Sequence, residues 1–300
     1  MANQAWQISE PGAYKLVTLD TAIPKPGSKQ ALVRIYAASY NYRDKLIRDL
    51  SPDYPLHAQP NLVPASDGAG IVQEAGTDSI WKKGDRVIIH AHDWLTGDDP
   101  RQFDMHSVIG SGTMDGTLRR YLVWDDAKLI RAPSQLSMEE AASLWCAGLT
   151  AFRGLFHGPI AIGPGTTVLT QGTGGVSCFA IQFAAAAGAP VIATSSSDDK
   201  LAVARKLGAT HTINYRKIPD WSSEVLKVTD GKGVDLTIDV VGAESIERTL
   251  ASTRFGGGVV LVGLLSEDPN LKVAILQSIL YGGKTCKCPS ILIMYCSYIY

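Results

Sequence analysis

The first part of the chain alternates short apolar runs with clusters of Gly, Pro and Asp. The runs are rich in β-branched and aromatic residues, which predicts strands rather than helices. The polar, glycine-rich stretch 94–117 predicts a long loop. The pattern therefore predicts a β-rich domain over residues 1–135, with strands at 31–39, 69–76, 85–91 and 119–124.

The hydrophobic pattern changes after residue 135. Ser137 is followed three residues later by Glu140, a capping box that predicts an amphipathic helix over 137–156. Beyond it, strand-like apolar runs alternate with helical segments, which is typical of βαβ units and a parallel sheet. The predicted fold class is therefore α/β, with a doubly wound parallel sheet over residues 136–285. Its strands are expected at 166–171, 190–195, 210–215, 234–242 and 258–265, and its helices at 175–188, 198–208, 221–233 and 245–257.

A glycine-rich turn joins the first strand of this sheet to the next helix. It reads Gly172-Thr173-Gly174-Gly175-Val176. Glycine permits a sharp turn and the close approach of a ligand, and the helix N-terminus presents unpaired N–H groups to a diphosphate. This is the basis of the G-x-G-x-x-G fingerprint of dinucleotide sites, although Ser177 stands at the third glycine position. A plain strand-to-helix turn is the alternative, and the run of βαβ units favours the dinucleotide site.

The end of the second strand bears on the choice between NAD and NADP. NAD sites have an acidic residue there, which holds the ribose hydroxyls. This chain has hydroxyl residues instead, and Ser195, Ser196 and the cation Lys200 suit a 2′-phosphate. Asp198 and Asp199 argue the other way, although acidic residues also serve as N-terminal charge on a helix. The pattern favours NADPH over NADH.

Composition narrows the classes of partner. The chain has 300 residues, enough for two domains, and its formal net charge of -1 gives no electrostatic footprint for nucleic acid or an anionic membrane. No apolar stretch reaches the length of a spanning helix, and the N-terminus lacks a signal-peptide pattern. Five cysteines, an odd number, do not indicate a disulfide framework. We therefore expect a cytoplasmic protein that binds a small-molecule substrate, with no nucleic-acid or membrane partner.

Several stretches carry the pattern of a known family. They are AASYNYRDKLI from Ala37, VPASDGAGIVQEAG from Val63, WKKGDRVI from Trp81, DGTLRRYLV from Asp115, EEAASLWCAGLTAFRGL from Glu139, QGTGGVSCFAIQFAAAAGA from Gln171 and KLGATHTINYR from Lys206. Together, over about residues 5–285, they resemble the medium-chain dehydrogenase/reductase superfamily. Within it, they resemble the zinc-independent quinone oxidoreductase and alcohol-dehydrogenase-like branch. The resemblance implies a GroES-like first domain followed by a Rossmann domain.

The resemblance also implies roles for single residues of the first domain. Relatives line the nicotinamide pocket with Asn and Tyr of the NYRD stretch, which here are Asn41 and Tyr42. By their place in this motif, Tyr42 and Arg43 are candidate proton donors, and a structural role is the alternative for both. Asp44 would then brace Arg43.

Further residues are matched to the cofactor through the same resemblance. Relatives place a Lys and a Tyr on the adenosine 2′-phosphate, and the matching residues are Lys200 and Tyr215. Positions that approach the nicotinamide match Thr150, Val241 and Gly263. The resemblance therefore also favours NADPH.

A catalytic zinc is expected to be absent. Zinc alcohol dehydrogenases of the same superfamily hold the metal with an early Cys and a later His-Glu pair. This chain has no Cys in the first stretch and has Ser66-Asp67 at the second. His90, His92 and His106 could form another metal site, but solvent-facing loop histidines are the simpler expectation. Without a metal, hydride transfer relies on positioning the nicotinamide against a conjugated acceptor.

The resemblance ends near Thr285, and the chain closes with CKCPSILIMYCSYIY. Cys286, Cys288 and Cys296 lack a recognisable metal spacing, so residues 286–300 are interpreted as an atypical, truncated tail. In relatives, later residues help to close the cofactor cleft, and edge strands pair in dimers. A homodimer is therefore left open.

The predicted function is an NADPH-dependent, zinc-independent oxidoreductase. It would transfer a hydride to a quinone, an enone, an aldehyde or a ketone. Two alternatives stay open. One is a catalytically silent dinucleotide-binding protein, because of the shortened end, and the other is an enoyl reductase of secondary metabolism.

Overall fold

The computed structural model describes residues 2–20, 22–52, 54–92, 104–263, 279 and 281–287. The chain forms two compact units, which divide between Cys146 and Ala147. The sequence pattern places this division earlier, at residues 135 and 136. The two divisions differ because helix α2 (Met138–Ser143) packs against strands β3 and β4 of the first unit.

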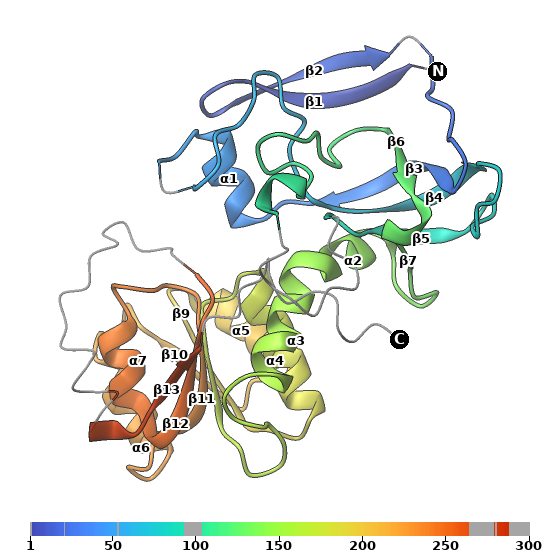
Figure 1. Ribbon diagram of the computed structural model, residues 1–300. Coiled ribbons are helices and arrows are strands. Elements are labelled where there is room, and N and C mark those ends of the chain that lie inside the picture. The colour runs from blue at the N-terminus through green and yellow to red at the C-terminus, as the bar shows by residue number, and fades with distance from the viewer. Residues whose placement is uncertain are drawn as a thin grey trace. The chain divides into compact units, whose positions relative to one another are not determined.

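A five-stranded antiparallel sheet forms the first unit, with the strand order β6-β3-β4-β5-β7 (Figure 1). The strands expected from the sequence are present, so the β-rich fold of this part is confirmed. A hairpin, which the sequence analysis missed, precedes the sheet and joins it through a bridge between Ala5 and Arg119. The strands are β1 (Asn3–Glu10), β2 (Ala13–Asp20), β3 (Gln30–Ser39), β4 (Asp67–Ala75), β5 (Arg86–Ile89), β6 (Tyr121–Asp125) and β7 (Leu129–Arg131).

Helix α1 (Tyr42–Arg48) follows β3 and is held by a small apolar core. Ile47 on its buried face packs with Ile8, Tyr54 and Leu62. Burial of such side chains contributes roughly 1.5–3 kcal/mol each relative to leaving them exposed. The core therefore fixes the position of the helix whose first turn carries the candidate catalytic residues.

The predicted capping box is confirmed at the start of α2. The Ser137 N–H donates to Glu140 Oε2 at 2.8 Å, and the Glu140 N–H donates to Ser137 Oγ at 3.1 Å. The single helix expected over 137–156 is instead divided. After α2 the backbone widens into a π-helical turn, η4 (Leu144–Gly148), and continues as α3 (Leu149–Phe156). Such π-turns interrupt helices and are frequent at functional sites.

Two histidines that were expected to face solvent are buried. His90 is 4% exposed and His92 is 0% exposed, so the expectation is wrong for both. Their rings lie 4.5 Å apart, and each contacts the ring of Trp145 from the end of the first unit. Burial, and then the neighbouring His90, lower the pKa of His92 to about 3. His106 is exposed, as expected, and lies in η2 (Met105–Ser107).

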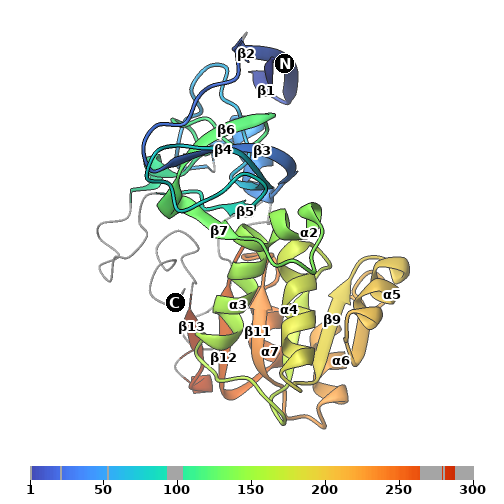
Figure 2. The same ribbon diagram turned by 90° about the vertical axis from the view of Figure 1, so that its right-hand side faces the viewer.

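A six-stranded parallel sheet forms the second unit, with the order β10-β9-β8-β11-β12-β13 (Figures 1 and 2). The α/β class with a doubly wound parallel sheet is thereby confirmed. The strands are β8 (Val168–Gln171), β9 (Val191–Ser195), β10 (His211–Asn214), β11 (Val234–Asp239), β12 (Thr253–Leu261) and β13 (Thr285–Lys287). The helices are α4 (Gly175–Ala186), α5 (Asp198–Lys206), α6 (Trp221–Val228) and α7 (Ile246–Ser252).

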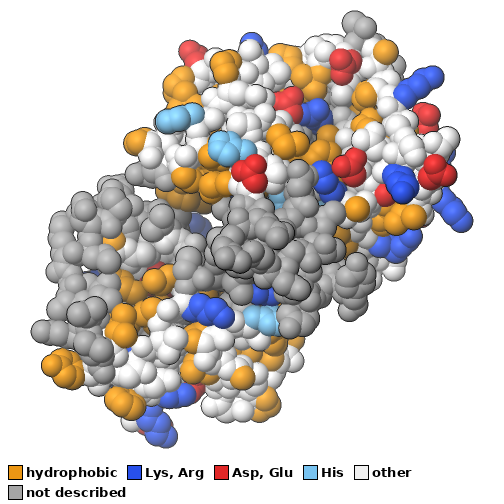
Figure 3. Space-filling model, viewed as in Figure 1, with side chains coloured by type: hydrophobic (Ala, Val, Ile, Leu, Met, Phe, Trp, Pro, Cys, Tyr) orange, Lys and Arg blue, Asp and Glu red, His pale blue; other side chains and the backbone are white. Residues whose placement is uncertain are grey.

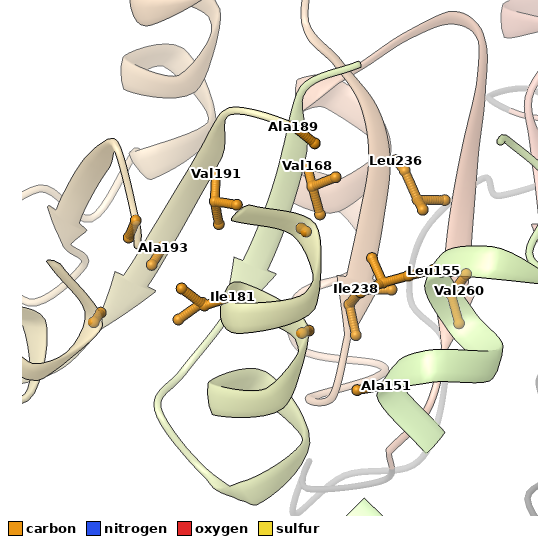
Figure 4. Close-up of a cluster of buried hydrophobic side chains, with 14 residues drawn as sticks. Ala151, Leu155, Val168, Ile181, Ala189, Val191, Ala193, Leu236, Ile238 and Val260 are labelled. Carbon is orange, nitrogen blue, oxygen red and sulfur yellow. The ribbon is translucent and has the colours of Figure 1, made fainter. Parts of the chain in front are cut away.

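Apolar side chains cover both faces of this sheet. On one face, Val168 and Ile238 pack with Leu155 of α3 and Ile181 of α4 (Figure 4). Because successive strand residues point to opposite faces, Leu169 joins the second cluster with helix α6. Two buried faces explain why the strands read as continuous apolar runs in the sequence.

Two boundaries differ from the sequence pattern. The helix expected over 245–257 ends at Ser252, because Thr253 already pairs with β11 through Val234. Gly256 has a φ of +67°, which a right-handed helix does not adopt. In addition, residues 285–287 form β13 at the sheet edge, so the sheet continues into the start of the segment interpreted as a tail. The rest of that tail, from residue 288, and the middle of the expected loop, residues 93–103, lie outside the described residues.

The distribution of surface charge and the length of the helices give two further observations. Acidic and basic side chains are intermixed on the face of the first unit in Figure 3. None of the helices in the described part of the chain combines the length and apolarity needed to span a bilayer.

Candidate functional site

The order of the strands defines a ligand-binding position in the second unit. β9 and β10 lie on one side of β8, and β11 to β13 lie on the other. The chain therefore changes direction between the neighbouring strands β8 and β11. In open parallel sheets, ligands bind at the carboxyl ends of the strands beside such a switch point. The glycine turn follows β8, so the predicted dinucleotide turn is at this position.

Glycine has a different structural role at each position of the turn. Gly172 has a φ of +71°, in the left-handed region that favours glycine. Gly174 has an ordinary φ of -78°, and a Cβ added there would have no neighbour within 4 Å. At Gly175 an added Cβ would lie 3.1 Å from the Cβ of Ala147. Gly172 thus makes the turn, Gly175 permits helix packing, and Gly174 leaves open space at the N-terminus of α4.

Ser177 accounts for the departure from the glycine fingerprint. Its side chain is 1% exposed, and its hydroxyl donates to the Gln171 carbonyl oxygen at 2.6 Å. The serine is small enough for helix α4 to pack against β8, and it pairs a carbonyl at the strand end. Ser177 is therefore compatible with the close helix–strand packing that the third glycine permits in the fingerprint.

The residues expected at the adenosine end lie together beside this turn. Asn214 is opposite Ser195 in the β9–β10 register, and the Tyr215 N–H donates to the Ser195 carbonyl oxygen at 3.1 Å. The Ser195 hydroxyl lies 3.5 Å from the hydroxyl of Thr173 in the glycine turn. Ser196 and the exposed Lys200 follow in the loop and first turn of α5.

A buried polar network, missed in the sequence, joins the ends of β8 and β11. The Asp239 carboxylate accepts hydrogen bonds from Gln171, Ser245 and Thr249. It also accepts from the N–H groups of Val241 and Gly242, at 3.0 and 2.9 Å. The network therefore fixes the loop after β11. An acidic residue that ends an apolar strand was the available signal.

The other expected nicotinamide contacts lie at the ends of secondary-structure elements of the same unit. Val241 is in the loop fixed by Asp239, and Gly263 follows β12. A Cβ at Gly263 would lie only 2.0 Å from the Val240 carbonyl oxygen, so only glycine fits there. Thr150 is buried on α3, which packs against α4. Val176 packs against the apolar core beneath the turn.

The candidate catalytic residues are in the first unit, and their side chains differ in how firmly they are held by neighbouring groups. The Tyr42 side chain is 44% exposed, and Lys45 lies 6.0 Å from its ring centroid. Arg43, in contrast, is held in place: its Nη2 donates to the Ile109 carbonyl oxygen at 3.2 Å, and its Nε lies 3.7 Å from Asp44 Oδ1. Asn41 donates its N–H to Asp44 Oδ2 at 2.8 Å. Tyr42 is therefore the freer group, and Arg43 takes part in a structural ion pair.

Next to this ion pair lies a second buried carboxyl, Asp67. Its Oδ1 accepts from the Ser66 hydroxyl at 2.9 Å, and its Oδ2 accepts from the Cys146 N–H at 3.1 Å. Burial, and then the charge of Asp44, raise the pKa of Asp67 to about 7, although Ser66, Arg43 and Asn41 oppose the rise. One guanidinium thus faces two buried carboxyls, and burial raises the pKa of both Asp44 and Asp67 while Arg43 opposes the rise.

The backbone before Asp67 is strained. Ala65 has a φ of +71°, which residues other than glycine rarely adopt. Such strain costs of order 1–3 kcal/mol and is concentrated at functional sites. It lies directly before Ser66 and Asp67, which stand where zinc alcohol dehydrogenases have the His-Glu pair.

These residues do not fit a zinc ion. Zinc in proteins takes thiolate, neutral imidazole or carboxylate ligands. Both Asp67 oxygens already accept hydrogen bonds, and burial, then Asp67, raise the pKa of the Cys146 thiol. Among the residues that the structure describes, no three His, Cys, Asp or Glu side chains are arranged to hold a metal.

Two family models match the chain. The model described as "Alcohol dehydrogenase GroES-like domain" matches residues 27–134, and the one described as "Zinc-binding dehydrogenase" matches residues 175–287. They match the two units in turn. The chain belongs to the medium-chain dehydrogenase/reductase superfamily, as its sequence motifs predicted, and the expected GroES-like and Rossmann-like folds are confirmed.

Individual relatives agree with this assignment. A zinc-type alcohol dehydrogenase-like protein of Schizosaccharomyces pombe is 45% identical over 83% of this chain and 72% of its own length. A solved NAD-dependent alcohol dehydrogenase is 32% identical, with a TM-score of 0.81 over 94% of this chain and 83% of that one. A quinone oxidoreductase structure from Pseudomonas syringae is 28% identical, with a TM-score of 0.76 over 97% and 82%. The relatives are thus oxidoreductases of one superfamily.

The open space at Gly174 gives a test of the dinucleotide site. We expect Gly174→Asp to keep or raise thermal stability, because Asp is a favoured N-cap residue. We expect the dissociation constant for a nicotinamide dinucleotide to rise by about tenfold or more, since the carboxylate would repel a diphosphate at the α4 N-terminus. Fluorescence titration measures the constant. Gly163→Asp is the matched control, because that glycine is equally open. Equal binding by both variants would contradict this site.

The raised pKa of Asp67 predicts a pH-dependent stability. The protonated acid is favoured in the folded state, with a pKa of about 7 against about 3.9 unfolded. Its stabilising contribution is therefore complete below about pH 4 and declines as the pH rises towards 7, then stays level. We expect Asp67→Asn to lack this decline in denaturant unfolding between pH 5 and 8. The exposed Asp78→Asn is the control. Parallel pH profiles for wild type and Asp67→Asn would refute the assignment.

Proposed function

We propose that the chain is an NADPH-dependent, zinc-independent oxidoreductase that transfers a hydride to a conjugated carbonyl compound such as a quinone or an enone, or to an aldehyde or ketone. The observation that carries the proposal is the glycine turn at the switch point, with Ser195 and Tyr215 beside it. Family membership supports the reaction class, and these residues support the choice of cofactor.

The preference for NADPH rests on the residues at the ends of β9 and β10. A 2′-phosphate carries a charge of about -1.5 to -2 near pH 7 and offers strong acceptor oxygens. The hydroxyls of Ser195, Ser196 and Tyr215 are suitable donors, and Lys200 supplies a charge. No carboxylate ends strand β9, where NAD sites carry one.

In the proposed reaction the bound nicotinamide supplies the hydride. The N-terminal amides of α4 would hold the diphosphate, and Thr150, Val241 and Gly263 would position the ring. Asp239 holds the loop that presents Val241. This fixed loop would keep the ring in one orientation, which is the main contribution that a protein makes to hydride transfer.

The polar residues of the first unit would orient the acceptor. We assign Asn41 and Tyr42 to the substrate pocket, with the exposed Tyr42 phenol as proton donor in preference to Arg43, whose guanidinium is held by Asp44 and Ile109. Without a Lewis acid, an acceptor that delocalises charge onto its oxygen is favoured. A cytoplasmic location and a homodimer stay predictions.

Cofactor binding and turnover together test the proposal. We expect a lower dissociation constant for NADPH than for NADH, and NADPH oxidation above background with at least one member of a quinone and enone panel. We expect Lys200→Ala to raise the NADPH constant by about tenfold and leave the NADH constant nearly unchanged, because only NADPH carries the phosphate. Lys206→Ala, in the last turn of the same helix, is the control.

Two results would contradict the proposal in different ways. Equal affinity for both cofactors would remove the preference for NADPH. Intact NADPH binding without oxidation of any acceptor would favour the catalytically silent dinucleotide-binding protein.

A further inference from the structure

Two acidic residues at the start of α5, Asp198 and Asp199, argue against a phosphate at the adenosine end, and the structure shows which groups bind the first of them. Asp198 is the first residue of α5. Its Oδ1 accepts a hydrogen bond from Asn214 Nδ2 at 2.7 Å, and its Oδ2 accepts from Lys217 Nζ at 2.5 Å. Asn214 ends β10, and Lys217 lies in the turn that follows. The carboxylate is thus drawn to the end of β10.

This ion pair lies beside the residues proposed to hold the 2′-phosphate. Asn214 is directly opposite Ser195 in the parallel register of β9 and β10. Tyr215 is the next residue, and its N–H bonds to the Ser195 carbonyl oxygen. The same short segment therefore carries both the proposed phosphate ligand Tyr215 and the partners of Asp198.

The negative charge of Asp198 opposes the binding of a phosphate at this site. The hydrogen bonds from Asn214 and Lys217 hold the pKa of Asp198 below its ordinary value, so the group is ionised near neutral pH. An unpaired carboxylate here would repel a phosphate and could instead accept hydrogen bonds from ribose hydroxyls, as acids do in NAD sites. The ammonium of Lys217 balances this charge.

We propose that Lys217 is a specificity-determining residue, which admits a 2′-phosphorylated dinucleotide by neutralising Asp198 beside Ser195 and Tyr215. The inference rests on the proposed NADPH preference and adds to it the residue that prevents Asp198 from reversing it. Lys217 belongs to the turn after β10, so it was outside the fingerprint that the sequence analysis used.

A double-mutant cycle on the full chain tests the inference through dissociation constants for NADPH and NADH. We expect Lys217→Ala to raise the NADPH constant by about tenfold and the NADH constant by no more than about twofold, because only the phosphate is repelled by the uncovered carboxylate. Asp198→Asn alone should lower the NADPH constant, because the Lys217 charge is then unopposed, and should change the NADH constant little. The double variant should regain NADPH affinity to within about threefold of wild type, since neither charge is then present.

The controls separate this inference from the function on which it rests. Lys227→Ala removes another exposed lysine of the same unit, one paired with Glu224 at 3.6 Å, and should change neither constant. Circular dichroism checks that each variant is folded. A wild type that prefers NADPH, with an unchanged constant in Lys217→Ala, overturns only the role of Lys217. If Lys217→Ala loses NADPH affinity and the added Asp198→Asn does not restore it, Lys217 does not act by neutralising Asp198. A wild type without preference overturns both proposals.

Discussion

The reversal of the chain at Gly172 is the constraint on which the second unit depends. Strand β8 must end and helix α4 must begin within a few residues, so that the helix returns over one sheet face. The left-handed φ of Gly172 achieves this, and the Ser177 hydroxyl pairs the carbonyl at the strand end. The core in Figure 4 forms because α4 is thereby brought over β8 and β11. The same reversal leaves the first amides of α4 at the carboxyl edge of the sheet, where a dinucleotide is proposed to bind.

The hydrogen-bond network of Asp239 fixes the backbone at this carboxyl edge of the sheet. A buried carboxylate is costly unless hydrogen bonds replace the water it loses. Asp239 obtains them from side chains of Gln171, Ser245 and Thr249 and from two backbone N–H groups. These donors come from β8, α7 and the loop after β11. One buried acid thus joins the two strands at the switch point and fixes the loop beside them.

Local patterns were sufficient for most of the fold. The capping box at Ser137, the glycine turn and the alternation of strands with helices depend on neighbouring residues, and the structure contains each of them. Hydrogen bonds and ion pairs between residues far apart in the sequence could not be predicted from local patterns. Gln171 and Asp239 are far apart in sequence, and Lys217 meets Asp198 only because β10 lies next to β9. His90 and His92 were misjudged for the same reason, since their burial depends on Trp145 from a distant segment.

The buried acids of the two units differ in their hydrogen-bond donors and in the charges around them. Asp239 accepts hydrogen bonds from groups of β8, α7 and the loop after β11, and it acts as a fixed structural acceptor. Asp67 accepts hydrogen bonds from the Ser66 hydroxyl and the Cys146 N–H, and it lies beside the second carboxyl, Asp44, and the cation Arg43. Burial with too few donors and too little positive charge favours the protonated acid. In the first unit the pKa values of both buried carboxyls, Asp44 on helix α1 and Asp67 beside it, are raised, with burial as the largest cause and Arg43 opposing the rise.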